Sequence, residues 1–254
     1  MKALPASLFV ALFAAACAGP PAADDTAADA SLSTEATPAE ALLASAIAYH
    51  DPVGEWSNFA GVLEFEELRP DGDARRTDVG LDVSESTFSH FTTADGREVL
   101  KQVVTEGCAS TVDGTAPTPE EVEAFSLECG QIERNRNYYL YLWGLPMKLL
   151  DPGTRIDSSV ERTEFQGQPV DQIRVTYEAE VGGDTWYFYF LPESARMVGY
   201  RFYHDESVGD GEYITLDEEV AVGRMRLPAR RRWFVNADDR FLGEDVLIGT
   251  HPLP

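Results

Sequence analysis

The sequence predicts a mainly β protein of the α+β class, built on one curved, largely antiparallel sheet of about ten or eleven strands with helices on one face. Apolar and polar residues alternate with a period of two through most of the chain after Trp56. Short turn clusters such as PDGD and TADGR separate these segments, which leaves no room for the crossover helices of a parallel sheet. Helix-start signals occur near residues 37 and 118 instead of after every strand.

The N-terminus has the composition of an export signal. A short basic start precedes an apolar run at residues 4–16, which ends in three alanines and is followed at once by Cys17. The run is too short to span a bilayer comfortably, so we expect residues 1–16 to be a signal peptide. Small residues before a cysteine resemble the bacterial lipobox, which implies lipidation of Cys17. A plain signal peptide with an incidental cysteine is the alternative.

Residues 17–36 are rich in Ala, Asp, Pro, Ser and Thr and contain almost no large apolar side chains. They bury too little surface to fold, so we expect a tether between the lipid anchor and a single domain at residues 37–254. Ala18 follows the cysteine where Asp would indicate inner-membrane retention. We therefore expect a protein anchored in the cell envelope, on the periplasmic face of the outer membrane.

The cysteines and the charge agree with export. Of three cysteines, Cys108 and Cys129 remain after lipidation, and an even pair in an oxidising compartment predicts a disulfide, with free buried thiols as the alternative. The net charge is −24, from 44 acidic and 20 basic residues. Such a chain repels phosphate backbones, so nucleic acid is excluded as a partner.

The first folded element is a helix at residues 38–49, because residues 37–40 supply an N-cap threonine, a proline at N1 and a glutamate at N3. A β meander follows from about residue 62. A second helix opens at residues 118–121 with the same capping pattern and leads towards Cys129.

The segment NYYLYLWGLPMKLLDPGT at residues 137–154 is the most apolar part of the chain after the signal. Its Tyr and Trp content favours a strand, but Gly144 and Pro146 follow it as they follow helices, with the glycine at the C′ position. We predict a helix whose apolar stripe contains Tyr138, Tyr141 and Leu142. A helix that is apolar on nearly all sides must be covered by the sheet and by a ligand or another element.

A second meander runs from residue 160 to residue 248. Its strand at residues 185–190, TWYFYF, puts Trp186, Phe188 and Phe190 on one face and Tyr187 and Tyr189 on the other. A strand that is apolar on both faces is covered on both or lines an apolar space. Ordinary core packing and a ligand cavity both fit this pattern.

Five arginines lie close together near the C-terminus. They fit an anionic head group at a cavity mouth, or ion pairs with the acidic residues 217–219, and Pro228 between them suits a hairpin or an edge. The residues are Arg224, Arg226, Arg230, Arg231 and Arg232.

The layout resembles the half-barrel of the LolA/LolB-like superfamily of lipoprotein-localisation carriers. The resemblance rests on a helix leading into WSNFAGVLEF at residues 56–65, a central helical insertion, and a second meander containing DTWYFYF. It implies an open half-barrel with the insertion on the concave face. AYHDPVGEW at residues 48–56, the segment at 137–154 and GEYITL at 211–216 also resemble an uncharacterised family of bacterial lipoproteins, which share a domain of unknown function.

We therefore interpret the chain as a monomeric envelope lipoprotein that binds an acyl chain, lipid, lipopeptide or other hydrophobic molecule. The candidate ligand-binding residues are Tyr138, Tyr139, Tyr141, Leu142, Trp143, Leu145, Met147, Trp186, Phe188 and Phe190. No motif for a cofactor, a metal or catalysis is recognisable. A structural or partner-binding protein with a filled core is one alternative, and an enzyme that uses His50 or His204 is another.

Overall fold

The computed structural model describes residues 35–70 and 72–253. The expected signal peptide, Cys17 and the tether up to residue 34 lie outside the described residues. Residues 36–254 form one compact unit. All three buried apolar clusters and every strand pairing of the described chain lie within this unit, so it contains the interactions that fold it.

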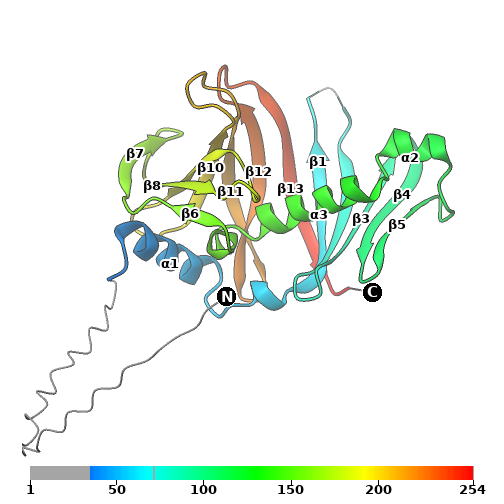
Figure 1. Cartoon of the computed structure of the whole chain (residues 1–254), viewed down its shortest axis with the longest axis horizontal. Coiled ribbons are helices and arrows are strands. Elements are labelled where there is room, and N and C mark those ends of the chain that lie inside the picture. Colours follow the sequence, from blue (N-terminus) through cyan, green and yellow to red (C-terminus); the bar gives the residue numbers. More distant parts are fainter. Residues whose placement is uncertain (1–34, 71, 254) are drawn as a thin grey trace, which may run out of the picture. The chain divides into compact units, whose positions relative to one another are not determined.

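The unit is built on one open sheet in which every neighbouring pair of strands is antiparallel (Figure 1). The order is β5-β4-β3-β2-β1-β13-β12-β11-β10-β9-β8-β6, and β7 pairs with β8. The strands are β1 (Ala60–Leu68), β2 (Arg75–Asp82), β3 (Thr87–Ala94), β4 (Arg97–Val104), β5 (Gly107–Val112), β6 (Thr154–Ile156), β7 (Glu161–Phe165), β8 (Gln168–Tyr177), β9 (Thr185–Phe190), β10 (Met197–Tyr203), β11 (Glu212–Val222), β12 (Met225–Val235) and β13 (Phe241–His251).

The predicted fold class is confirmed, but the sheet has thirteen strands in the described chain and not ten or eleven. The sequence pattern missed β5, whose small and polar residues lack clear alternation, and β6, which is only three residues long. It also divided β12 at Pro228. Pro228 pairs with Glu219 of β11, whereas β13 pairs with β12 only from Arg230 onward. The proline therefore lies in a local edge of a continuous strand, so of the two expected arrangements, a hairpin or an edge, the structure has the edge.

Both predicted capping boxes are present. Helix α1 (Pro38–His50) is capped by Thr37 and Glu40, and helix α2 (Pro119–Phe125) is capped by Thr118 and Glu121. In each helix the threonine hydroxyl accepts from the N3 backbone N–H while the glutamate accepts from the N-cap backbone N–H. These local signals made the two helix starts predictable from sequence.

The aromatic segment is helical, as predicted, but its helix α3 (Cys129–Trp143) begins about two turns earlier than its apolar residues suggested. Short 3₁₀ helices η1 (Trp56–Asn58) and η2 (Met147–Leu150) complete the helical elements. The expectation of a left-handed C′ glycine was wrong, because Gly144 is the C-cap residue and has φ −87°. A glycine is needed there for close packing, since a Cβ atom would lie 2.6 Å from the Trp56 ring.

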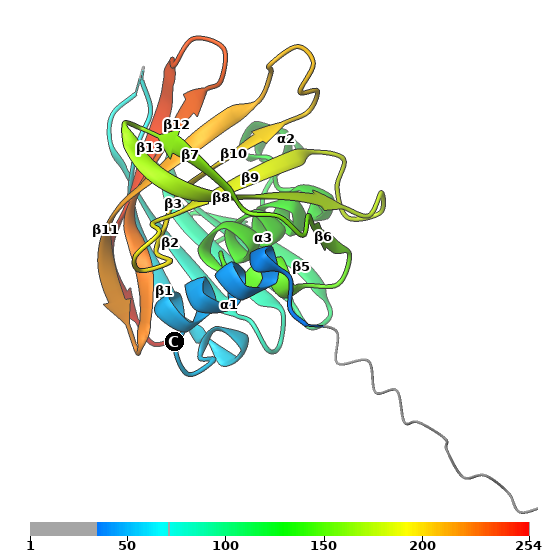
Figure 2. The same cartoon turned by 90° about the vertical axis from the view of Figure 1, so that its left-hand side faces the viewer.

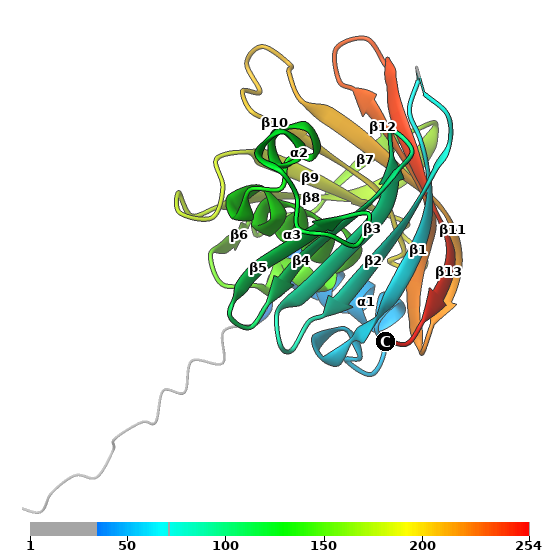
Figure 3. The ribbon, with the colours of Figure 1, turned by 90° about the vertical axis from the view of Figure 1, so that its right-hand side faces the viewer.

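The sheet curves around α1 and α3, which lie on its concave face (Figure 2). Strands β1 to β5 run side by side and form one end of the sheet, with α2 beside the ends of these strands (Figure 3). The largest apolar cluster contains residues from α1, α3 and most strands, including Leu43, Leu63 and Trp143. No helix among the described residues is both long and apolar enough to cross a bilayer.

Candidate functional site

Helix α3 divides the concave face, and three contacts fix its position. At its start, Cys129 is joined to Cys108 of β5 by the expected disulfide, with the two Cα atoms 5.4 Å apart. At its end, Trp56 packs against Gly144. The last residue of the helix, Trp143, covers the Arg231 guanidinium of β12, whose central carbon lies 3.7 Å from the ring centroid. These contacts therefore hold the helix at both ends.

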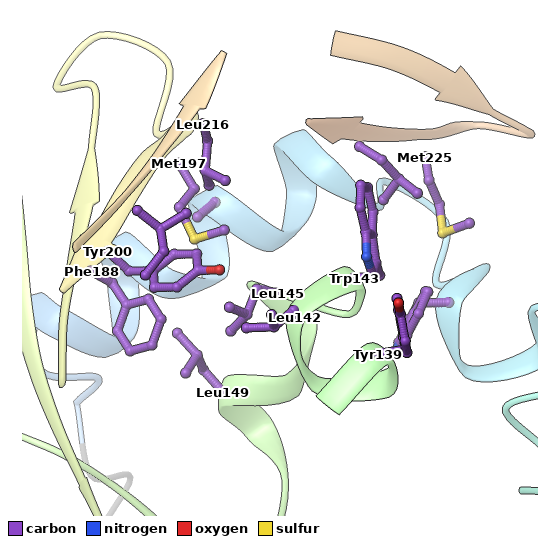
Figure 4. Close-up of a cluster of buried hydrophobic side chains, with 14 of the residues drawn as sticks. Tyr139, Leu142, Trp143, Leu145, Leu149, Phe188, Met197, Tyr200, Leu216 and Met225 are labelled. Atoms are coloured by element: carbon purple, nitrogen blue, oxygen red, sulfur yellow. The ribbon is translucent and has the colours of Figure 1, made fainter. Parts of the chain in front are cut away.

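Most of the candidate ligand-binding residues are buried in the core. Tyr139, Leu142, Trp143, Leu145, Phe188 and Phe190 are all less than one-tenth exposed and belong to the largest apolar cluster. Figure 4 shows several of them packed with Met197, Tyr200 and Met225. Side chains of the protein therefore fill the space between most of α3 and the sheet.

The remaining candidates lie at the margin of this core. Tyr141, Met147 and Trp186 are half-buried, and Tyr138 is 44% exposed. Tyr138 and Tyr141 line different cavities. Tyr138 lines a cavity beside β1 to β4, whereas Tyr141 lines a cavity beside β8 and β9. The structure thus splits the predicted residues between a filled core and two separate pockets.

The pocket beside β8 and β9, which we call the aromatic pocket, has a volume of about 420 Å³. Its apolar lining comes from Leu140, Tyr141, Tyr177, Val181 and Trp186. The Tyr141 and Trp186 rings meet edge to face with centroids 5.6 Å apart, and the Tyr141 and Tyr177 hydroxyls are hydrogen-bonded. Pockets of this size, mainly apolar with a few polar groups, suit small hydrophobic ligands.

Polar side chains also line the aromatic pocket. Lys148 and Asp151 form an ion pair there, and Asn137 and Asp184 also line the space. Each of these residues is at least partly exposed to solvent. The pocket therefore has an apolar interior and a polar rim.

Strand β9 is covered on both faces, in agreement with its double row of aromatic residues. Trp186, Phe188 and Phe190 face the concave side, whereas Tyr187 and Tyr189 belong to an outer cluster. In that outer cluster Phe165 of β7 stacks on Tyr189 with ring centroids 4.2 Å apart. The outer row of β9 is therefore explained by packing under the β7–β8 hairpin.

The pocket on the other side of α3, which we call the polar pocket, has a volume of about 1090 Å³. It is lined by residues of β1 to β4, by the end of α2 and by α3 from Gln131 to Tyr139. Buried positions that would ordinarily hold apolar residues are polar here: Glu67, Thr77, His90 and Thr92 are all nearly inaccessible to solvent. The sequence pattern of alternating residues did not reveal this group, because polar residues on the inner face read as solvent-facing ones.

Glu67 lies at the floor of the polar pocket with its oxygens already engaged. One oxygen accepts from Arg75 Nε at 2.9 Å, and the other accepts from the Tyr139 hydroxyl at 3.2 Å. Burial raises the pKa of Glu67, but the charge and hydrogen bonds of Arg75 outweigh it and the pKa falls below its usual value. Glu67 is therefore ionised and paired at neutral pH.

Asp245 is the cross-strand partner of Glu67 in the β1–β13 pairing and forms an ion pair with Arg69 at 3.0 Å. Burial and the charge of Glu67 raise the pKa of Asp245 to about 6 despite the nearby Arg69. The ionised Glu67 and the low solvent exposure therefore disfavour a negative charge on Asp245. Two coupled carboxyl groups with separated pKa values lie within one buried network.

Arg231 is fully buried beneath α3, and it has only part of the hydrogen bonding that a guanidinium requires. Its Nη2 donates to the Leu142 carbonyl at 2.7 Å, but Nε and Nη1 have no partner among residues 35–70 and 72–253. The Tyr200 hydroxyl likewise finds none in that part of the chain. Burial lowers the pKa of Arg231, although Tyr200, Tyr138 and Asp245 oppose the shift. The arginine cluster is thus not a single anion site.

Arg230 and Arg232 follow the ion-pair interpretation, whereas Arg224 and Arg226 form no ion pair with the described residues; the backbone N–H of Arg224 donates to Glu55 at 2.7 Å. Arg230 and Arg232 both pair with Glu244, and they also reach Glu218 and Asp217 respectively. Arg226 donates to the Tyr49 carbonyl at 2.8 Å and lies over the Tyr49 ring. These contacts join β11, β12 and β13 to one another and to α1.

The two histidines considered for catalysis have separate surroundings. His50 is buried; its Nδ1 contacts the Arg226 carbonyl at 2.7 Å and its Nε2 accepts from the Met197 N–H at 3.0 Å. Both ring nitrogens are therefore used in holding α1 to the sheet. His204 is exposed, and its Nδ1 lies 2.8 Å from Asp184, which raises the pKa of His204.

A metal centre is not indicated in the described part of the chain. The one group of potential ligands with suitable spacing there is Cys108, Cys129 and Glu133. The two cysteines of this group are already joined in the disulfide, so their sulfur atoms are not thiolate ligands.

Residues 28–250 match the model of DUF6503, a family of unknown function, and the chain belongs to this family. No curated protein matches the chain significantly.

Solved structures similar to this chain include the LolA superfamily protein NE2245 from Nitrosomonas europaea, at 11% identity over 87% of this chain and 96% of that one, with a TM-score of 0.49. A putative outer membrane lipoprotein-sorting protein domain from Vibrio parahaemolyticus is 11% identical over 84% and 91%, with a TM-score of 0.47. A DUF1329 family protein from Desulfovibrio piger is 6% identical over 85% and 93%, with a TM-score of 0.45. At these values no similarity decides what this chain binds.

Proposed function

We propose that this protein is a non-enzymatic binding protein of the bacterial cell envelope that holds a hydrophobic molecule, such as an acyl chain, in the aromatic pocket. The observation that carries the proposal is the inward row of β9. The Phe188 and Phe190 side chains are fully buried in the core. Trp186, in the same row, is half-buried and lines the aromatic pocket of about 420 Å³. An apolar ligand there would continue the core outwards and remove apolar surface from water.

The envelope location rests on the N-terminal sequence. An export signal, lipidation of Cys17 and a polar tether up to residue 36 would leave the domain anchored at the outer membrane, facing the periplasm. A tethered monomer with an apolar pocket would be suited to accepting a lipid, a lipopeptide or another hydrophobic molecule near the membrane surface. The disulfide between Cys108 and Cys129 supports an oxidising compartment.

A non-enzymatic role is favoured by the state of the histidines. Both nitrogens of His50 have backbone partners, which leaves neither of them to exchange a proton with a substrate. His204 is exposed beside Asp184, and the described chain places no candidate nucleophile in hydrogen-bond contact with it.

A purely structural or partner-binding role is the second candidate, and the filled core favours it. Six of the candidate residues, including Leu145 and Phe188, pack against other side chains of the protein and leave no space for a ligand. Under this alternative the aromatic pocket would be a surface depression that takes up nothing.

The two functions are separated by native mass spectrometry with lipid extraction on residues 36–254, purified from a bacterial periplasm. Two exposed valines supply a matched pair of variants: Val181 lines the aromatic pocket and is 57% exposed, whereas Val208 lies outside it and is 71% exposed. A carboxylate beside an apolar ligand is costly, so Val181→Asp should weaken uptake of an added fatty acid by about tenfold or more. Val208→Asp should leave it unchanged.

The structural alternative predicts a different result. The domain would fold and purify without a bound molecule, would take up no added fatty acid, and the two aspartate variants would behave alike. That outcome would remove the proposed function.

A further inference from the structure

The polar pocket is not used by the proposed function, and its composition indicates a ligand of different chemistry. At the ends of β1 to β4, the side chains lining the concave face change from apolar to polar. Phe65 is followed two positions later by Glu67, and Phe88 by His90. Successive residues of a strand alternate between faces, so these polar side chains remain on the inner face. The sheet therefore forms a buried polar floor beneath a cavity of about 1090 Å³.

His90 is the first sign of an absent ligand. It is 6% exposed and lines the polar pocket, and its Nδ1 has no hydrogen-bond partner in the part of the chain that the structure describes. A buried polar atom without a partner is destabilising, and such atoms are uncommon in folded proteins. Burial lowers the pKa of His90 to about 4, so the ring is neutral at pH 7 and one of its nitrogens carries a proton to donate.

Lys101 is the second sign. It is the direct cross-strand partner of His90 in the β3–β4 pairing and lines the same pocket. Its side chain is half-buried, yet no carboxylate of the described residues lies within ion-pair distance of it. The chain has 44 acidic and 20 basic residues, so a partly buried lysine without an acidic partner is unusual here.

The carboxylate whose charge acts on Lys101 is the exposed Glu128, which lies beyond ion-pair distance and outside the cavity lining; burial and the charge of Arg75 outweigh it, so the pKa of Lys101 falls below its usual value. The other carboxylates near Lys101 are engaged elsewhere or lie at the edge of the cavity. Glu67 is bound by Arg75 and Tyr139, and Asp245 by Arg69. The other acidic residues lining the cavity are Asp73 and Asp95, which are exposed. Among the residues that the structure describes, Lys101 has no ion-pair partner, His90 Nδ1 has no hydrogen-bond partner, and no free carboxylate lies on the floor of the pocket.

We propose that the polar pocket is a second ligand site, which binds the carboxylate or phosphate group of a small molecule through Lys101 and His90. The Lys101 ammonium supplies the charge and the neutral His90 ring supplies an N–H donor, and the oxyanion satisfies both groups. Helix α3 separates this site from the aromatic pocket, so the inference does not depend on the proposed hydrophobic ligand.

The test is isothermal titration calorimetry of residues 36–254 in a phosphate-free buffer of low ionic strength. Sodium phosphate, sodium succinate and dihexanoyl phosphatidylglycerol below its micelle concentration serve as separate probes. We expect saturable binding of at least one probe. Lys101→Met should weaken it by about tenfold or more, which is about 1.4 kcal/mol.

Lys148→Met is the matched control, since Lys148 is the other lysine of the described residues, pairs with Asp151 and lines the aromatic pocket. It should keep the affinity within about twofold of the wild type, or about 0.4 kcal/mol. The imidazole ¹⁵N signals of His90 should shift on saturation of the unmodified protein, which tests the site without any variant at Lys101. Val181→Asp should leave anion binding intact, so this result is independent of the fatty-acid experiment.

Two outcomes would overturn the proposal: none of the three probes binds saturably, or Lys101→Met binds as tightly as the wild type. If the proposal holds, the source of the anion follows from the ranking of the probes. Tighter binding of phosphate or succinate assigns a soluble anion. Tighter binding of the short phosphatidylglycerol assigns a lipid head group.

Discussion

The two sides of α3 differ in what the same helix and the same sheet place on the concave face. On the side of β8 and β9, Tyr141 meets Trp186 and Tyr177 in a half-open aromatic pocket. On the side of β1 to β4, Tyr139 meets Glu67 and His90 above a polar floor. Tyr139 and Tyr141 are two positions apart in α3, about 200° around the helix, so the helix directs them to opposite sides and the sheet supplies the groups that each one meets. One open sheet can thus support two unlike sites.

The largest effect is expected where both sides depend on one residue. Trp143 is almost fully buried, tilts against Phe65 at a centroid distance of 4.6 Å and covers Arg231. Trp143→Ala should lower the free energy of unfolding by about 3–5 kcal/mol, because it leaves a cavity and uncovers a buried charge. Urea denaturation measures the loss. A loss below about 1 kcal/mol, within the range of surface substitutions, would show that Trp143 does not hold the end of α3 against the sheet.

The disulfide should matter mainly on the polar side. It closes a loop with a sequence separation of 21 and joins β5 to the start of α3, near Gln131 of the polar pocket. Replacing Cys108 and Cys129 together by serine should cost about 3 kcal/mol of unfolding free energy. Anion binding should weaken while fatty-acid uptake is retained at a temperature where the variant is folded. Equal loss of both activities would contradict the separation of the two sides.

Acid should destabilise the protein through His90. The folded-state pKa of His90 is about 4, against 6.5 for an ordinary histidine, so the unfolded chain binds more protons between these two values. The contribution of His90 is therefore fully present above pH 6.5 and is lost as the pH falls towards 4. It amounts to about 3 kcal/mol.

The measurement compares the free energy of unfolding at pH 7 and pH 4.5. His90→Gln should show a smaller loss on acidification than the wild type, whereas the exposed His251→Gln should not differ from it. Asp245 opposes the wild-type trend, because a carboxyl with a raised pKa stabilises the fold as the pH falls from about 6 towards 3.8. For that reason the difference between the variants, and not the wild-type curve, is diagnostic. Identical acid losses in all three proteins would exclude a buried neutral His90.

The smallest effects come from two hydroxyl deletions that compare the sides directly. Tyr139→Phe removes a donor from the buried, charged Glu67 and should cost about 2 kcal/mol of unfolding free energy. Tyr141→Phe removes a hydrogen bond between two neutral hydroxyls and should cost about 1 kcal/mol. The reverse order would show that Glu67 is not held ionised by its neighbours.

Much of the fold was predictable because helix caps and strand alternation are local features of the sequence. Most of the two pockets was not predictable, because their linings depend on contacts between distant segments. The capping residues that begin with the threonines at 37 and 118 predict the two helix starts, and the alternation of apolar and polar residues predicts most strands. The start of α3 was missed because Gln131 and Asn135 give no apolar stripe. The polar pocket was missed because inward Glu67 and His90 have the same pattern as outward polar residues. Their direction is fixed only by pairing across the sheet.

The aromatic residues were identified correctly as a group, but their division was not visible in the sequence. Trp186 and Phe188 are equivalent by alternation, yet Phe188 is fully buried under η2 and α3 whereas Trp186 lies at the edge of the pocket. That difference depends on the position of α3 and on that of the loop between β8 and β9, which both line the aromatic pocket. Neither has a local sequence signal.

The most direct test of a hydrophobic ligand in the aromatic pocket is quenching of tryptophan fluorescence by a brominated fatty acid. The chain has four tryptophans, and Trp186 is the one that lines this pocket. We predict saturable quenching in residues 36–254 that disappears in Trp186→Phe, while the variant still takes up the fatty acid because the pocket stays apolar. Quenching that persists in Trp186→Phe, or no saturable quenching in the wild type, would contradict a ligand at this position.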